Sequence, residues 1–293
     1  MHRYLKCVGF RSITKKRQLK EVFDQILEQP DSFQLVQTDE DSNLCVLMKD
    51  FAPDMGIALC GEYNDEDEFE LEYYYPYYFG DVVSTNAPCR FKRQGEKESY
   101  AGSCDDYRIG ITLIFYLSNF MDMQELFSNT GSVPEAGAVC LSGLAEEGKI
   151  LFPVYHTAEE KTAAQSAAEK RCEMIEAAKG GDRSAIEYLT QDEMRTFSHL
   201  NRQINSNDIY TLIDSFFMPD GVECDQYAVM GEIEDVNSVV NDFTGEIVYQ
   251  LLVNCNDIYL LIAIHEDDLV GIPENGRRFK GRIWLQGHVD FSY

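Results

Sequence analysis

The spacing of the apolar residues changes along this chain, and each change restricts the element that a segment can form. Between residues 15 and 29 apolar residues recur at three- and four-residue intervals, as one face of a helix requires. From residue 33 to about 155 the interval is mostly two, the spacing of a half-buried strand. We therefore predict a helix at 15–29, a short helix at 121–127 and an antiparallel sheet that they pack against, an α+β fold. The predicted strands are 33–37, 44–49, 55–62, 68–78, 90–93, 108–117, 138–144 and 150–155.

The middle of the chain has a different composition. Residues 163–178 are rich in Ala, Glu and Lys, with only a thin apolar stripe, and they follow a capping box at 157–160. This pattern predicts an exposed helix that connects two domains. Two more helices are expected after it, the first beginning at 190–193 and the second spanning 209–217. The inward-facing residues of the first are Met194, Phe197, Leu200 and Ile204.

The interval of two returns at Gln226 and continues to the end of the chain. Short alternating segments are separated by turns at 241–246 and 254–257, and a polar stretch at 265–275 precedes the last segment. Four or five such strands favour a small, partly closed β-barrel of the oligonucleotide/oligosaccharide-binding (OB) type, although other small barrels have similar strand counts. The predicted organisation is an α+β domain at 1–155, a helical connector at 156–221 and an OB-like barrel at 222–293.

Charge and cysteine spacing restrict the partners and the compartment. The formal net charge is −26, which repels phosphate backbones and anionic membrane surfaces, although acidity can also serve solubility alone. The N-terminus has no apolar signal segment, and the longest uncharged, mostly apolar run, 109–121, is too short to span a bilayer. Nine cysteines without a CxxC pair fit reduced thiols. We therefore expect a cytoplasmic protein without a membrane partner.

The sequence carries no motif of a common catalytic, cofactor or metal site. It lacks a P-loop, a dinucleotide-binding glycine fingerprint, a G-x-S-x-G elbow and an H-E-x-x-H helix. The densest group of possible metal ligands is the run His265–Asp268. Because neighbours in an extended chain point to opposite sides, these four residues favour a solvated loop or a helix start over an ion site. We assign no cofactor, no metal and no catalytic residue.

The C-terminal segment 276–287 is the most distinctive stretch. Cations alternate there with Phe279 and the chain's only tryptophan, a composition that can stack bases and contact phosphates. The glycines at 276, 281 and 287 favour a second interpretation, in which the strand closes the barrel and its residues are structural. A protein or peptide contact is the third interpretation. The candidate binding surface consists of Arg277, Arg278, Lys280, Arg282 and Trp284.

Several segments spread over the whole chain resemble one bacterial family. They are Met1–Phe10, Arg108–Ile111, Thr244–Glu246, Cys255–Asp257, Asp268–Leu269, Gly276–Gly281 and Ile283–Gly287. The family is domain of unknown function 3881, from anaerobic Gram-positive bacteria, and the C-terminal segments are the most specific part of the resemblance. It implies a cytoplasmic protein of similar length and two-part layout. It brings no activity, cofactor or catalytic residue.

Three functional hypotheses follow from these observations. The first is a non-enzymatic binding or adaptor protein that uses the C-terminal barrel to hold a protein or peptide partner. The second is a nucleic-acid-associated protein that binds through the strand Arg277–Trp284, which the net charge of the chain disfavours. The third is an enzyme whose site lies between the two domains and lacks known motifs.

Overall fold

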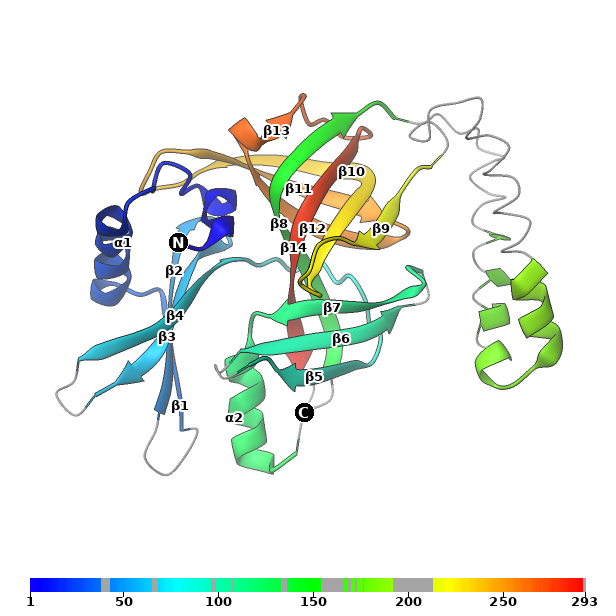
Figure 1. The fold of residues 1–293 in the computed structure, drawn as a ribbon, viewed down its shortest axis with the longest axis horizontal. Helices are drawn as coiled ribbons and strands as arrows, with labels where there is room; N and C mark the ends of the chain where they lie inside the picture. Colours follow the sequence, from blue (N-terminus) through cyan, green and yellow to red (C-terminus); the bar gives the residue numbers. More distant parts are fainter. Residues whose placement is uncertain are drawn as a thin grey trace.

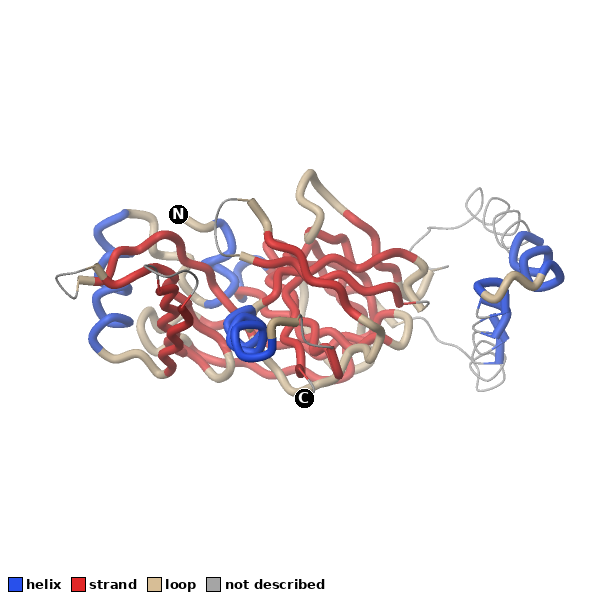
Figure 2. Tube along the Cα trace, turned by 90° about the horizontal axis from the view of Figure 1, so that it is seen from below, coloured by secondary structure: helices blue, strands red, loops and turns tan. Residues whose placement is uncertain are grey.

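The structure is a computed structural model, and the part of the chain that it describes is mostly β with few helices (Figures 1 and 2). The strands form a four-stranded antiparallel sheet and a ten-stranded mixed sheet. None of the helices in this part is long and apolar enough to cross a membrane. The described residues are 1–37, 43–64, 68–95, 99–106, 108–132, 136–153, most of 166–191, and 213–291.

The N-terminal region forms the four-stranded sheet and its covering helix. The predicted helix is confirmed as α1 (Lys16–Glu28), which buries Leu19, Val22 and Ile26. The predicted antiparallel sheet is confirmed for its first four strands, with order β1-β2-β3-β4, so that β1 lies at its edge. The later predicted strands join the ten-stranded sheet instead. A short 3-10 helix, η1 (Arg3–Val8), precedes α1. The strands are β1 (Ser32–Gln37), β2 (Asn43–Ala52), β3 (Met55–Tyr63) and β4 (Phe69–Tyr78).

The ten-stranded sheet joins segments from both halves of the chain. Its order is β13-β8-β12-β11-β10-β14-β7-β6-β5, with β9 paired to β10 and an additional pairing of β8 with β14. The second predicted helix is confirmed as α2 (Phe120–Thr130), between β7 and β8. The strands are β5 (Cys89–Arg93), β6 (Tyr100–Asp106), β7 (Ile111–Leu117), β8 (Ala136–Leu151), β9 (Phe216–Pro219), β10 (Gln226–Val240), β11 (Ile247–Cys255), β12 (Ile258–His265), β13 (Leu269–Val270) and β14 (Arg278–Phe291).

Five of these strands form a closed ring of hydrogen-bonded neighbours, β8-β12-β11-β10-β14 and back to β8. Four of them come from the region predicted to be a barrel. The fifth, β8, lies before it and pairs with β14 from Ala136 opposite Phe291 to Leu151 opposite Arg278. The predicted strands 138–144 and 150–155 fall on this one strand as far as Leu151. Strand pairing therefore crosses residue 155, and the division into three regions stays a prediction.

The connector is described only in part. Helical residues occur between 166 and 191, within the predicted connector, but the helix expected from 194 to 204 lies outside the described residues. The helix predicted at 209–217 is wrong at its described end, because Phe216 and Phe217 belong to β9. Phe217 is buried and its ring packs on Tyr227 of β10. A neighbouring strand thus gives this short apolar run an extended conformation that its local sequence did not reveal.

The two sheets meet at Gln286 of β14. Its buried side chain accepts a hydrogen bond from the backbone N–H of Tyr78 (3.2 Å) and donates one to the carbonyl oxygen of Pro76 (2.8 Å), both in β4. Rings from η1, β7 and β14 pack beside it: Trp284 lies 5.2 Å from Tyr4 and 5.2 Å from Tyr116, measured between ring centroids. Strand β14 thus holds the five-stranded ring of strands and the four-stranded sheet together.

Candidate functional site

The structure places the aromatic member of the predicted binding surface inside the protein. Trp284 is only 6% exposed, and its indole Nε1 donates a 2.8 Å hydrogen bond to Oδ2 of Asp225. Burial raises the pKa of Asp225, while the hydrogen bond from Trp284 acts in the opposite direction. Because the ring also stacks on Tyr4 and lies 5.1 Å from the ring of His2, both the ring and its polar atom are engaged within the chain. Trp284 is therefore not displayed for stacking on a ligand.

The cations of β14 are divided between the interior and the surface. Arg278 is buried and donates from Nε to the carbonyl oxygen of Phe152 (3.0 Å) and from Nη1 to that of Ile213 (2.8 Å). Arg277 pairs with Glu274 at 2.8 Å, and Arg282 pairs with Asp220 at 2.5 Å. Lys280 is partly exposed. Since Arg278 and Trp284 are interior, the five residues do not form one continuous basic and aromatic face, and binding by the others stays a prediction.

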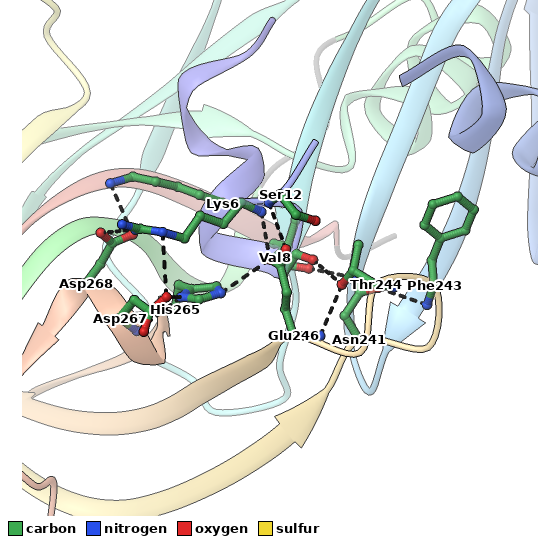
Figure 3. A network of polar contacts seen from close by, with 12 residues as sticks. Lys6, Val8, Ser12, Asn241, Phe243, Thr244, Glu246, His265, Asp267 and Asp268 are labelled. Carbon is green, nitrogen blue, oxygen red and sulfur yellow. Dashed lines mark hydrogen bonds and ion pairs between the residues drawn. The ribbon is translucent and has the colours of Figure 1, made fainter. Parts of the chain in front are cut away.

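The run His265–Asp268 forms part of a docking network for the N-terminal segment (Figure 3). Glu266–Asp268 is a three-residue 3-10 helix, η3, and His265 before it is buried, so the run is neither a fully solvated loop nor the start of a longer helix. Asp268 accepts a hydrogen bond from Arg11 and lies 3.1 Å from the Nζ of Lys6. No group of three or more possible metal-ligating side chains occurs in the described residues.

The turn between β10 and β11 completes this network (Figure 3). Glu246 accepts hydrogen bonds from the backbone N–H groups of Arg11 and Ser12, each 2.7 Å long, and its Oε2 lies 3.2 Å from Nε2 of the buried His265. Asn241, fully buried, donates to the carbonyl oxygen of Val8. Gly9 beside it has φ +84°, and a Cβ there would lie 2.6 Å from that of Asn241. The network fastens the N-terminal segment to the five-stranded ring.

Asp268 should make the stability of this network pH-dependent. Burial alone would raise the pKa of Asp268, but Arg11 and Lys6 outweigh burial and hold it below its ordinary value. A depressed folded-state pKa stabilises the protein above the unfolded value of about 4, and that contribution is lost as the pH falls through the folded-state pKa. Because Arg11 is partly exposed, we expect Asp268→Asn to lower the free energy of unfolding by only about 1–2 kcal/mol at pH 7.

Urea titrations of both proteins between pH 2 and 7 measure this effect. The difference in free energy of unfolding between the wild type and Asp268→Asn should become smaller as the pH falls toward 2. Asp267→Asn is the matched control, because the side chain of Asp267 is 67% exposed and should contribute little. Equal effects of the two substitutions at neutral pH would contradict the assignment.

A different surface, formed by β1 and α2, is hollowed. The first hollow has a volume of about 370 Å³ and is lined by the consecutive residues Phe33–Gln37 together with Met121, Glu125, Ser128 and Asn129. Gln34 donates a 2.8 Å hydrogen bond to Asp122 and so connects β1 to α2. Phe33 and Leu35, 53% and 52% exposed, place large apolar side chains at its border.

A second hollow lies on the other side of α2. It has a volume of about 480 Å³ and is lined by Asn119, Asp122, Glu125, Leu126, Asn129, Thr130 and the end of β14, His288–Phe291. The two hollows share Glu125 and Asn129, so they adjoin over α2. Together we call them the α2 groove.

The α2 groove is acidic. Its described lining contains the carboxylates of Asp122, Glu125 and Asp290 and no lysine or arginine. Burial lowers the pKa of His288, so that this imidazole is neutral at pH 7. The lining offers carboxylate and amide acceptors, exposed apolar side chains and a strand edge. Such an arrangement can bind, and it brings together no nucleophile hydrogen-bonded to a base.

The sequence does not predict this groove, although it contains one signal for it. Phe33 and Leu35 alternate with polar residues as a half-buried strand does, but the sequence does not say that this strand lies at an edge of the sheet. The acidic residues of α2 resemble any solvated helix face. Only the sheet order and the packing of α2 beside β1 bring these residues together.

Comparison with known proteins identifies one family. The sequence profile described as "Domain of unknown function, E. rectale Gene description (DUF3881)" matches residues 5–287. No curated protein and no solved structure matches the chain.

Proposed function

We propose that this chain, which belongs to the DUF3881 family, is a non-enzymatic binding protein that holds an extended, basic segment of a partner protein in the α2 groove. The partner class is the one expected from the sequence, a protein or peptide. The surface differs from the predicted one on strand Arg277–Trp284, because two of its five candidate residues, Arg278 and Trp284, are buried.

The main support for this proposal is that five consecutive residues of β1 line the first hollow. Neighbours along a strand point to opposite faces, so a hollow that touches all of Phe33–Gln37 runs along the backbone edge of the strand. That edge has no strand partner within the described part of the chain. An extended peptide that adds to such an edge gains backbone hydrogen bonds, and its alternate side chains reach the neighbouring hollow.

The charge and size of the groove indicate what the peptide contains. Asp122, Glu125 and Asp290 favour lysine or arginine side chains, and the net charge of −26 draws cationic segments toward the protein. The volume of 370 Å³ is at the lower end of ligand pockets, which hold about 300–1,000 Å³, so one or two apolar side chains would fill it. The expected ligand alternates apolar and basic residues.

Fluorescence anisotropy with defined peptides tests this function. Three labelled probes are compared: one alternating Val and Lys, one alternating Val and Glu, and the Val/Lys probe with a central proline, which removes a backbone N–H. Only the first should bind, and its affinity should fall as salt is added. Leu35→Asn should weaken binding roughly tenfold through lost apolar contact. Ile272→Asn is the matched control, because Ile272 is also apolar, exposed and far along the chain from the groove.

The proposal fails if the Val/Glu probe binds as well as the Val/Lys probe, or if Leu35→Asn and Ile272→Asn have the same effect. A single-stranded DNA probe in the same assay tests the second hypothesis. Binding of DNA that is lost in Arg277→Ala combined with Arg282→Ala would favour the nucleic-acid function over the peptide function. The same two substitutions should leave peptide binding unchanged.

The finer architecture is also a proposal. The five-stranded ring β8-β12-β11-β10-β14 supports an OB-like interpretation, since small partly open barrels of that type have five strands. On this view the ring is the rigid body that carries α2 and the end of β14.

A further inference from the structure

Two cysteines lie directly opposite each other on the hairpin β5–β6. In the register of this antiparallel pair the partner of Cys89 is Cys104. Residues directly opposite on antiparallel strands have Cα atoms about 4.5–5.5 Å apart, and a disulfide requires about 4.4–6.8 Å. The backbone therefore already holds the two side chains at a distance that a disulfide can bridge.

We infer that Cys89 and Cys104 form a reversible disulfide and make this hairpin a redox-dependent modification site. Both are free thiols in the structure. Cys89 lies on the outermost strand of the ten-stranded sheet and is partly exposed, whereas Cys104 is buried on the neighbouring strand β6. An oxidant from solvent thus reaches Cys89 first, and Cys104 is positioned to react second.

The surroundings of the two cysteines indicate which one attacks the oxidant and which one resolves the mixed disulfide. A hydrogen bond from the Cys104 thiol lowers the pKa of Cys89, which makes Cys89 the more nucleophilic sulfur. The same contact and burial raise the pKa of Cys104. Cys89 can also donate to the carbonyl oxygen of Ala87, 3.4 Å away, while it is a thiol. Cys89 is therefore the attacking cysteine and Cys104 the resolving one.

No other two described cysteines share this arrangement. Cys45 and Cys60 lie on neighbouring strands, but their register partners are Gly61 and Val46. Cys224 is exposed but has no cysteine opposite it in the described strands. The remaining free thiols belong to separate elements. The inference thus concerns one pair, and the other cysteines serve as internal controls.

The reaction needs a low-molecular-weight disulfide as its oxidant, for which oxidised glutathione is the probe. The Cys89 thiolate attacks one sulfur, the glutathione disulfide bond breaks, and one glutathione thiolate leaves. The Cys104 thiol then loses its proton, and its sulfur attacks Cys89 and displaces the second glutathione. Two protein thiols are oxidised to one disulfide, one glutathione disulfide is reduced to two thiols, and the two protons pass to the thiolates.

Mass spectrometry of the full chain after treatment with oxidised glutathione tests the inference. The wild type should lose two hydrogen atoms at this hairpin, peptide mapping should show a Cys89–Cys104 link, and dithiothreitol should reverse it. In Cys104→Ser, Cys89 should instead retain a glutathione adduct. In Cys89→Ser, Cys104 should stay a thiol because it is buried. Cys224→Ser is the control and should form the link as the wild type does.

Amide hydrogen exchange provides a readout of structure for the same samples. The link closes a loop across the hairpin and should slow exchange in Cys89–Arg93 by roughly tenfold, because local opening of the edge strand is restricted. A stable glutathione adduct on Cys89 in the wild type, a link to any other cysteine, or the absence of any modification at Cys89 would overturn the inference.

Discussion

Replacing Trp284 by alanine should lower the free energy of unfolding by about 3–5 kcal/mol, as the loss of a large buried side chain does. The ring is packed between Tyr4 of η1 and Tyr116 of β7, and its Nε1 satisfies the buried carboxylate of Asp225. The substitution removes these contacts together and opens a cavity where the two sheets meet. It also leaves Asp225 without its indole donor.

Denaturant unfolding followed by circular dichroism measures this loss. Trp284→Phe is the informative companion, because it retains a stacked ring but no hydrogen-bond donor, and we expect it to cost about 1–3 kcal/mol. As the only tryptophan, Trp284 also reports on itself: its emission in the native protein should be that of a buried indole and should shift to the red on unfolding. A loss below about 1 kcal/mol for the alanine variant would show that the indole is not tightly packed against Tyr4 and Tyr116.

Replacing Gly287 by valine should cost about 3 kcal/mol or more, because β14 passes directly beneath the ring of Phe115. A Cβ at position 287 would lie 2.3 Å from this ring, and one at Gly102 of β6 would lie 2.2 Å from it. Phe115 is fully buried and cannot turn away into solvent. The carbonyl of Gly287 also accepts hydrogen bonds from the backbone and side chain of Ser118, which fixes the backbone at this point.

A double-mutant cycle identifies the ring as the cause. Phe115→Ala alone should destabilise the protein by about 3–5 kcal/mol through its cavity. In the double variant with Gly287→Val, the methyl groups of the introduced valine should partly fill that cavity. The double variant should therefore lose at least about 1 kcal/mol less free energy of unfolding than the sum of the two single variants. Simple additivity would show that the strain at Gly287 comes from other neighbours.

Elements with a strong local pattern were predictable from the sequence. The apolar stripe of α1 and the alternation in β10, β11, β12 and β14 set their type and most of their length. The strands that pair with them were not predictable, because alternation identifies a strand and its apolar face but not the strand beside it. The pairing of β8 with β14 joins segments more than a hundred residues apart. The described part of the chain is mostly β with few helices, where the prediction was an α+β fold.

The binding surface predicted on strand Arg277–Trp284 does not form one continuous face, for a related reason. The composition of Arg277–Trp284 is that of a binding strand, but β14 has β8 on one side and β10 on the other. Arg278 and Trp284 consequently meet Phe152, Ile213 and Asp225 rather than solvent. Leu35 shows the opposite case. Its place in an alternating strand is typical of a buried residue, yet it is exposed, on a strand at the edge of its sheet.

Photo-crosslinking of the Val/Lys peptide, carrying a reactive group at one apolar position, locates the binding surface on the full chain. The proposed function predicts labelled residues within Phe33–Gln37 and on α2 around Glu125, with labelling suppressed by Leu35→Asn and by unlabelled peptide. Labelling concentrated at Arg277, Lys280 and Arg282, with the α2 groove unmodified, would contradict it and restore the C-terminal strand as the docking surface.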